Sequence, residues 1–325
     1  MEIAALTDVQ LATLPASGLD TAVGNTPLLP LQHITAHLPD QVQIYAKAEW
    51  FNLSGSVKDR PALSILRSAM NSGQLAHGKR LLDSTSGNMG IAYATLGTNL
   101  GIAVTLTLPA NASVERIAIL RALGVELILT DPLEGSDGAI RAARKLAAEH
   151  PERYFYANQY DNPANWQAHY FTTGPEIVQQ TAGKVSHFVA GLGTSGTLTG
   201  VSRYLRQVNP DIEMIAVQPD APFHGLEGLK HMNSAIKPGI YDPSLPDRIL
   251  EVQTEAAYEM VRRLVREEGL FVGISSGAAA VAALQVAAEL ERGTIVTVFP
   301  DSGHKYLSDQ KLWDLPESLP DPKGE

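Results

Sequence analysis

The sequence predicts an α/β protein of two lobes, with mostly parallel sheets and a ligand held in the cleft between the lobes. The chain has 325 residues, which is more than a typical single domain. From Leu81 onward, short apolar runs alternate with helical patterns, as expected for repeated βα units and a parallel sheet covered by helices. The alternation comes in two series, which we interpret as two lobes. Proteins of this class commonly bind ligands in the crevice at the ends of their strands, so we expect the ligand between the lobes.

The first series occupies residues 80–157. We expect strands at Arg80–Asp83, Ala103–Leu108, Glu126–Thr130 and Tyr154–Ala157, and helices near 88–100, 113–123 and 135–149. Gly101 and Gly124 stand where helices commonly end, because glycine adopts the left-handed conformation of a C-cap without strain. Ser113 is a suitable residue to begin the second helix.

The second series begins with a helix near 174–182. Further strands are expected at His187–Ala190, Met214–Val217 and Ile295–Phe299, with helices near 198–207, 255–268 and 276–290. The stretch Pro219–Pro246 is rich in Gly, Pro and His and lacks periodicity, which is typical of a binding loop. Gly277–Leu290 is very apolar but too short to span a bilayer, so we expect a buried helix there. Residues 1–22 predict a short helix and an arm.

Composition and charge limit the possible partners. Hydrophobic residues make up 44% and charged residues 18%, as in an ordinary globular protein. The net charge of -10 argues against nucleic acid or an anionic membrane as a partner. The absence of cysteine excludes disulfides, thiolate metal sites and a thiol nucleophile, and we expect no metal. The N-terminus has early acidic residues and no basic segment, so it is not a signal peptide and a cytoplasmic location is expected.

Lys58 lies between a strand-like run, Val42–Ala48, and a helical pattern that begins at Pro61. Proline fits the first helical turn, and Asp59 or Ser56 is a candidate cap for that helix. A rigid loop that removes water from a lysine lowers its pKa and makes the amine a usable nucleophile and base. The competing interpretation is a solvated surface lysine.

Two stretches rich in Ser, Thr and Gly follow strands and open helices. In Ser84–Gly90, the hydroxyls and free backbone donors suit an anion such as a carboxylate, although a purely structural turn would have the same composition. In Gly191–Thr197, the glycines let the backbone approach a ligand closely and the hydroxyls add donors, which suits a phosphate. A third stretch, Phe299–His304, follows the last strand, where Ser302 or Asp301 is a candidate contact for a ring nitrogen, or the segment is a plain turn.

Gly191, Gly193 and Gly196 also match G-x-G-x-x-G, with Asp220 further along the chain. A nucleotide-binding oxidoreductase is therefore an alternative. Against it, the loop hydroxyls suit a terminal phosphate better than a bridging pyrophosphate. In addition, Asp220 lies in the irregular loop rather than at the end of the second strand.

Taken together, these segments resemble the pyridoxal-phosphate enzymes of the cysteine synthase family, and within it the second (B) type. The matching segments occur in family order over residues 20–310: Gly24–Leu28, Ser54–Pro61, Thr85–Asn88, Asn158–Asn165, Thr173–Glu176, Gly191–Thr197, Gly273–Ala278 and Asp301–Ser308. The resemblance implies the tryptophan-synthase-β-like fold (fold type II), with pyridoxal 5′-phosphate in the interlobe cleft. It also implies a larger cofactor-binding lobe of residues 1–60 and 166–325, a smaller closing lobe of residues 61–165, and a homodimer.

The resemblance also implies roles for individual residues. Lys58 would form the Schiff base and move the α-proton, Asn88 would bind the ring hydroxyl, and Ser302 would meet the pyridine nitrogen. The phosphate would lie on Gly193, Thr194, Ser195, Gly196 and Thr197. The substrate would be bound by Thr85, Ser86, Gly87, Met89 and Gln159. Two residues depart from the family pattern, since Met89 stands where a threonine is common and Ser195 where a glycine is common.

The reaction implied is β-replacement, in which O-acetyl-L-serine and a sulfur donor such as sulfide give L-cysteine. Residues 219–232 contain no arginine, and a phosphate leaving group in a closed cleft needs a compensating cation, so O-acetylserine is expected over O-phosphoserine. An arginine of the opposing lobe, such as Arg116 or Arg121, would remove this reason if it reached the site. Alternatives in the same class are an O-phosphoserine sulfhydrylase, a cystathionine β-synthase and a diaminopropionate-type synthase. A catalytically silent homologue acting as a binding protein is a further alternative.

Overall fold

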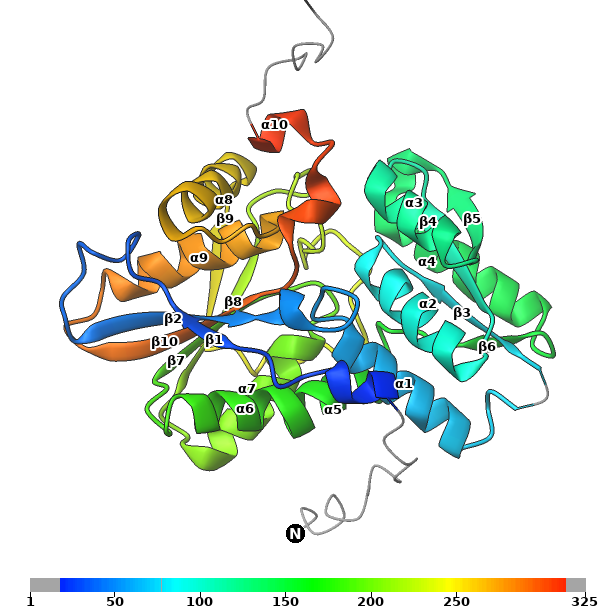
Figure 1. The fold of residues 1–325 in the computed structure, drawn as a ribbon, viewed down its shortest axis with the longest axis horizontal. Coiled ribbons are helices and arrows are strands. Elements are labelled where there is room, and N and C mark those ends of the chain that lie inside the picture. The colour runs from blue at the N-terminus through cyan, green and yellow to red at the C-terminus, as the bar shows by residue number, and fades with distance from the viewer. Residues whose placement is uncertain (1–17, 77, 314–325) are drawn as a thin grey trace, which may run out of the picture.

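The computed structural model describes residues 18–76 and 78–313, and within them two β-sheets lie next to each other (Figure 1). The larger sheet has the strand order β1-β2-β10-β7-β8-β9 and the smaller β5-β4-β3-β6. Every pair is parallel except β1 with β2. The expected two-lobed, mostly parallel α/β fold is confirmed. Of the helix and arm expected in residues 1–22, only the 3₁₀ turn Gly18–Ala22 lies within the described residues.

The larger sheet takes its strands from both ends of the chain. They are β1 (Leu28–Pro30), β2 (Val42–Ala48), β7 (His187–Gly191), β8 (Glu213–Pro219), β9 (Arg248–Val252) and β10 (Gly293–Phe299). Figure 1 shows two helices over one face, α8 (Thr254–Glu268) and α9 (Ile274–Ala287), and two below the other, α6 (Gly174–Gln180) and α7 (Gly196–Val208). Because β2 pairs with β10 along its whole length, the loops that follow these two strands begin next to each other.

Side-chain alternation along the central strands explains the two faces. In β8, Ile215 and Val217 pack into the core shared with α8 and α9, whereas Met214 and Ala216 pack into the core shared with α6 and α7. Successive residues of a strand point to opposite faces, so a strand covered on both sides is a continuous apolar run. This pattern buries the strands and leaves only their ends available for polar chemistry.

The smaller sheet comes from one continuous part of the chain. Its strands are β3 (Arg80–Ser84), β4 (Val104–Pro109), β5 (Glu126–Thr130) and β6 (Tyr154–Tyr156), and its helices are α1 (Asp59–Asn71), α2 (Asn88–Leu100), α3 (Val114–Ala122) and α4 (Gly135–Glu149). The expected helix ends are confirmed. Gly101 is a left-handed C-cap at φ 70°, and the Ser113 hydroxyl accepts a hydrogen bond from the Arg116 backbone.

Several local predictions were incomplete or wrong. Strand β9 and the helix α5 (Pro163–Ala168), which continues into a π-helical turn at His169–Thr173, were not predicted, nor was α10 (Gln310–Trp313). Helix α1 begins at Asp59, and no side chain caps it. Instead, the Asp59 carboxylate turns back and accepts hydrogen bonds from the backbone and hydroxyl of Ser54, at 2.7 and 2.5 Å. This link braces the loop that carries Lys58.

The long connection after β8 is irregular, as expected, since residues 220–247 contain no helix or strand. It runs beside the smaller lobe, and the Lys230 ammonium reaches Asp137 of α4 at 2.8 Å. Among residues 18–76 and 78–313, no helix is both long and apolar enough to cross a membrane. The predicted buried helix is α9, most of whose side chains are buried.

Candidate active site

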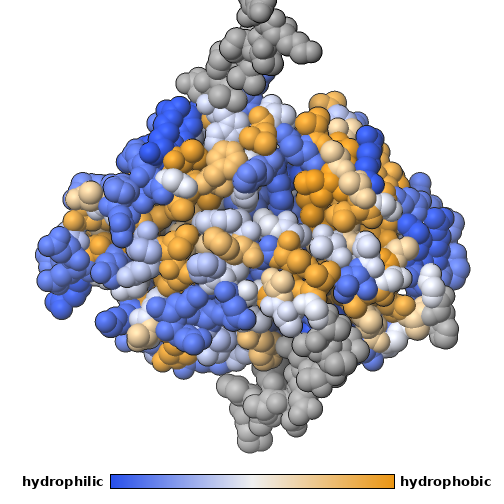
Figure 2. Space-filling view, viewed as in Figure 1, coloured by the Kyte–Doolittle hydropathy of each residue, from blue (hydrophilic) through white to orange (hydrophobic). Residues whose placement is uncertain are grey.

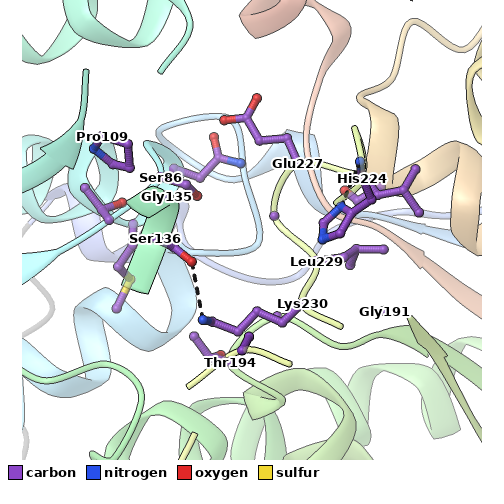
Figure 3. A pocket seen from close by; sticks show the side chains of 18 of the residues that line it. Ser86, Pro109, Gly135, Ser136, Gly191, Thr194, His224, Glu227, Leu229 and Lys230 are labelled. Carbon is purple, nitrogen blue, oxygen red and sulfur yellow. Dashed lines mark hydrogen bonds between the residues drawn. The ribbon is translucent and has the colours of Figure 1, made fainter. Parts of the chain in front are cut away.

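A cavity of about 780 Å³ lies between the two sheets and is lined by loops that follow strands of both. Figure 3 looks into it. Most of the residues singled out from the sequence meet here: Lys58, Thr85, Ser86, Asn88, Met89, Gln159, Gly193, Thr194, Ser195, Gly196 and Thr197. Gly87 and Ser302 do not line it. Loops widely separated in the sequence thus form one site at the carboxyl ends of parallel strands.

The segment Gly191–Thr197 forms a cradle between β7 and α7. A Cβ atom on Gly193 would lie 2.4 Å from the backbone oxygen of Gly228, and one on Gly196 would lie 2.0 Å from Oδ1 of Asn165, so neither position accepts a side chain. Ser195 sits at φ 68° and turns the chain into the helix. Free backbone N–H groups at the start of a helix favour an anion.

The donors of this cradle fit a phosphate group. The Thr194 hydroxyl accepts a hydrogen bond from the Asn165 amide at 3.1 Å, which fixes it in the loop. Thr197 approaches the buried His169 ring at 3.3 Å. Burial lowers the pKa of His169 to about 3, so this imidazole is neutral at ordinary pH and adds no positive charge to the cradle. The chemistry of the donor set is therefore that of the phosphate end of pyridoxal phosphate.

Lys58 faces the cavity from the loop after β2. The backbone N–H of Val57 donates to the carbonyl of Pro300 at 2.8 Å, and Ser56 bridges to Asp301, so the segment after β10 holds the lysine loop. Desolvation lowers the pKa of Lys58 below its usual value, and the nearby Asp301 charge opposes this effect. A lysine whose pKa is lowered by burial in a rigid site has the chemistry of a nucleophile and proton acceptor.

The substrate loop Ser84–Gly90 is braced from within. The Thr85 hydroxyl accepts hydrogen bonds from the backbone of Gly87 at 2.9 Å and of Gly90 at 3.2 Å. The Gln159 amide donates to the carbonyl of Ser84 at 2.6 Å. Gly87 has φ 144°, and a Cβ there would overlap the Arg116 side chain, so its role is to shape the loop. Thr85 and Gln159 thus line the cavity and also hold the loop around it.

Two expected cofactor contacts lie differently from the prediction. Asn88 lines the cavity, but its amide is held by Asp301 at 2.7 Å and by Lys305 at 2.9 Å. The Ser302 hydroxyl lies outside the lining and contacts the His304 ring at 2.5 Å and the Phe271 carbonyl at 3.4 Å. The Ser302 hydroxyl thus lies in a local turn rather than at the cavity, because the chain turns after Asp301.

Polar residues that line the cavity but were not assigned a role from the sequence include Arg116, Glu227, Lys230 and Ser275. Ser275 occupies the first turn of α9, within the family-like segment Gly273–Ala278, so a signal for it was present. Arg116 was named only as an arginine of the opposing lobe that would weaken the expectation of O-acetylserine if it reached the site. Nothing in its spacing indicates burial, yet it is only 2% exposed.

Asp83 joins the two substrate segments from beneath the cavity. Its carboxylate accepts hydrogen bonds from the backbones of Ser84 at 2.8 Å and Gln159 at 3.1 Å, and from the Tyr93 hydroxyl at 3.1 Å. Burial raises the pKa of Asp83 from 3.8 to about 7, against the effect of these hydrogen bonds. Between pH 3.8 and about 7, the folded protein therefore holds a proton that the unfolded chain has released. The contribution of this proton to the unfolding free energy is present at low pH and is lost as pH rises toward 7.

Asp83→Asn removes that titration. As pH rises from 3.8 to 7, we expect the unfolding free energy of the variant to gain on the order of 4 kcal/mol relative to that of the unchanged protein. Chemical denaturation of both proteins at a series of pH values measures the difference. A difference that is constant with pH would show that Asp83 keeps an ordinary carboxyl pKa.

Comparisons with known proteins agree with this geometry. Residues 19–301 match the family described as "Pyridoxal-phosphate dependent enzyme". The chain is 53% identical to a cysteine synthase of Aquifex aeolicus over 88% of this chain and 89% of that protein. It is 42% identical to cysteine synthase B of Pseudomonas aeruginosa over 88% of this chain and 94% of that protein. The crystal structure of a cysteine synthase from Entamoeba histolytica superposes with a TM-score of 0.86 at 37% identity, covering 95% of this chain and 93% of the other.

Proposed function

We propose that this chain, which belongs to the family of pyridoxal-phosphate-dependent enzymes and forms cysteine by β-replacement, uses O-acetyl-L-serine as its amino-acid donor and sulfide as its nucleophile. The observation that carries the proposal is the joining of Lys58, the phosphate cradle and the substrate loop in one cavity. Family membership excludes the nucleotide-binding oxidoreductase alternative.

Bound pyridoxal phosphate supplies an electron sink that makes the α-proton of an amino acid removable. In this proposal, the residues Gly193–Thr197 hold the phosphate, and Lys58 carries the cofactor and then accepts the α-proton through its amine. Thr85, Ser86, Met89 and Gln159 surround the substrate carboxylate, with Gly87 shaping their loop. Met89 is 2% exposed and offers an apolar contact in place of a hydroxyl.

Asn88 remains our proposed partner for the ring hydroxyl. The support is that its side chain lines the cavity and is fixed between Asp301 and Lys305. A fixed amide presents its remaining donor in one direction, which is what orienting a ring requires.

For the ring nitrogen, we propose Ser275 in place of Ser302. A neutral hydroxyl there leaves the pyridine unprotonated, a weaker electron sink than a pyridinium paired with a carboxylate. We expect Ser275→Ala to shift the visible absorption band of the bound cofactor and lower turnover. Ser302→Ala is the matched control and should leave the spectrum unchanged. The reverse pattern would return the role to Ser302.

We also propose that residues 61–165 form the lobe that closes over substrate. In support, they hold the whole smaller sheet and the substrate loop, while residues 1–60 and 166–325 hold the larger sheet and the phosphate cradle. The two lobe boundaries, at residues 60/61 and 165/166, fall inside α1 and α5. Each of these helices would therefore move as a whole with one of the two lobes. Closure of this kind excludes water during the reaction.

A homodimer in the cytoplasm completes the proposal. Figure 2 shows a surface that is hydrophilic at the ends of the molecule and more hydrophobic over α2 and α3. Val114 of α3 is 65% exposed and Phe51 is 57% exposed. A contiguous apolar surface is a candidate for a subunit contact. Light scattering of the purified protein measures the assembly, and a monomer at all concentrations would contradict it.

The function is tested by competing donors in a sulfide assay. O-acetyl-L-serine and O-phospho-L-serine are offered together, and cysteine formation from each is followed. We expect the kcat/KM for O-acetylserine to exceed that for O-phosphoserine. A higher value for O-phosphoserine, or cysteine formation from neither, would contradict the proposed donor.

A further inference from the structure

Two cations other than Lys58 line the cavity, and each is paired with a carboxylate from the opposite lobe. Arg116 of α3 forms an ion pair with Glu227, which lies in the loop after β8. Lys230 of that same loop forms an ion pair with Asp137 of α4 at 2.8 Å. The pairing is therefore reciprocal, since each lobe supplies one cation and one carboxylate. Figure 3 shows Glu227 and Lys230 on the loop and Ser136 facing the Lys230 amine.

Arg116 is placed to meet a substrate. Its side chain is 2% exposed and packs against Gly87 in the substrate loop. The guanidinium lies 4.5 Å from the centre of the Tyr306 ring and 3.7 Å from a carboxylate oxygen of Asp301. Its Nε atom is buried and has no hydrogen-bond partner in the described part of the chain. A buried guanidinium with an unused donor is the group that would bind a phosphate or another dianion.

Glu227 already occupies that guanidinium. Its carboxylate contacts Nη1 of Arg116 and is the more exposed partner, with a side chain that is 31% exposed against 2% for Arg116. Lys230 is likewise occupied, by Asp137 and by the Ser136 hydroxyl at 3.3 Å. A dianionic group entering the cavity would have to displace a carboxylate from these cations or lie beside it, and both outcomes are unfavourable in a desolvated site.

From these contacts, we propose that Glu227, supported by Asp137, is a specificity-determining residue that neutralises the cavity cations and so excludes substrates with a dianionic side-chain group. This inference rests on the proposed function and extends it. The absence of arginine from residues 219–232 is only half of the reason for the neutral-ester preference. Arg116 reaches the site from the other lobe, and its ion pair with Glu227 prevents it from compensating the charge of a phosphate group.

Glu227→Gln tests the inference. The amide keeps the size of the side chain and removes the carboxylate charge that contacts Nη1 of Arg116. We expect the ratio of kcat/KM for O-phospho-L-serine to that for O-acetyl-L-serine to rise by about 10- to 100-fold, the effect of a hydrogen bond to a charged group. Glu289→Gln is the matched control, because it removes one carboxylate from the exposed ion pair with Arg248 and should leave the ratio unchanged.

A binding measurement separates this inference from the proposed function. Titration of inorganic phosphate into the holoprotein by calorimetry should show binding in Glu227→Gln that is weaker or absent in the unchanged protein. The double variant Glu227→Gln/Arg116→Met should lose it. If the unchanged protein makes no cysteine from O-acetylserine, the proposed function fails, while the phosphate titration still reports on Glu227. An equal change for both donors, with no gain in phosphate binding, would show that the pair only joins the lobes and would overturn the inference.

Discussion

Lys58→Ala is expected to reduce cysteine formation by at least ~10²–10⁴-fold, the usual effect of losing a general base. The loss is expected to reach or exceed the upper end, because the same amine is proposed to carry the cofactor. The phosphate cradle is intact in the variant, so cofactor should still bind, with an altered absorption spectrum. Steady-state rates and the spectrum of the purified variant measure both effects.

The matched control is Lys79→Ala. Lys79 is a partly exposed lysine that does not line the cavity, and its amine donates to the carbonyl of Pro151 at 2.8 Å. This variant should keep its activity and spectrum. Activity in Lys58→Ala close to that of the control would show that another group moves the proton.

Arg60→Met is expected to lower the unfolding free energy by roughly 3–5 kcal/mol, as when one partner of a buried ion pair is removed. Arg60 follows Lys58 by two residues and donates to both oxygens of Glu49, at 2.7 and 2.8 Å, and to both oxygens of Glu176, at 2.6 and 2.8 Å. Glu49 is fully buried, and Lys47 also pairs with Glu176 at 2.6 Å. Without Arg60, two carboxylates would face a single lysine inside the protein.

The control for this variant lies on the same helix. Arg67 pairs with Asp20 at 2.7 Å, but both side chains are partly exposed, at 23% and 14%. Arg67→Met should therefore cost only about 0–1 kcal/mol. Denaturant unfolding of both variants gives the comparison, and equal losses would show that the buried network contributes no more than a surface pair.

The alternating pattern of strands and helices allowed most of the fold to be predicted. Strands such as β7 and β8 are continuous apolar runs because they are covered on both faces, and such runs are visible in a sequence. Strand β9 was missed because it is an edge strand whose sequence, Arg248–Val252, includes two charged residues, and its side chains are mostly partly exposed. Helix α5 has six residues, too few to establish a helical period.

The candidate site also has a part that could be predicted from the sequence and a part that could not. Loops at strand ends carry local signals, and this is why Lys58 and the segments 84–90 and 191–197 were found. The direction of a single side chain depends on how the chain turns. This explains why Ser302 was assigned to the ligand although its hydroxyl bonds to His304. Arg116 lies on α3 of the smaller lobe, and its burial depends on contacts with Gly87, Glu227 and Tyr306, which are distant in the sequence.

The most direct test of the central claim is to map the cofactor attachment. The holoprotein is reduced with borohydride, digested, and its pyridoxyl-labelled peptide identified by mass spectrometry. Lys305 is an internal comparison, because it is also buried, its pKa is likewise lowered by desolvation, and it lies near Lys58 without lining the cavity. We predict that the label is on Lys58 alone. A label on Lys305 or on any other lysine would contradict the account.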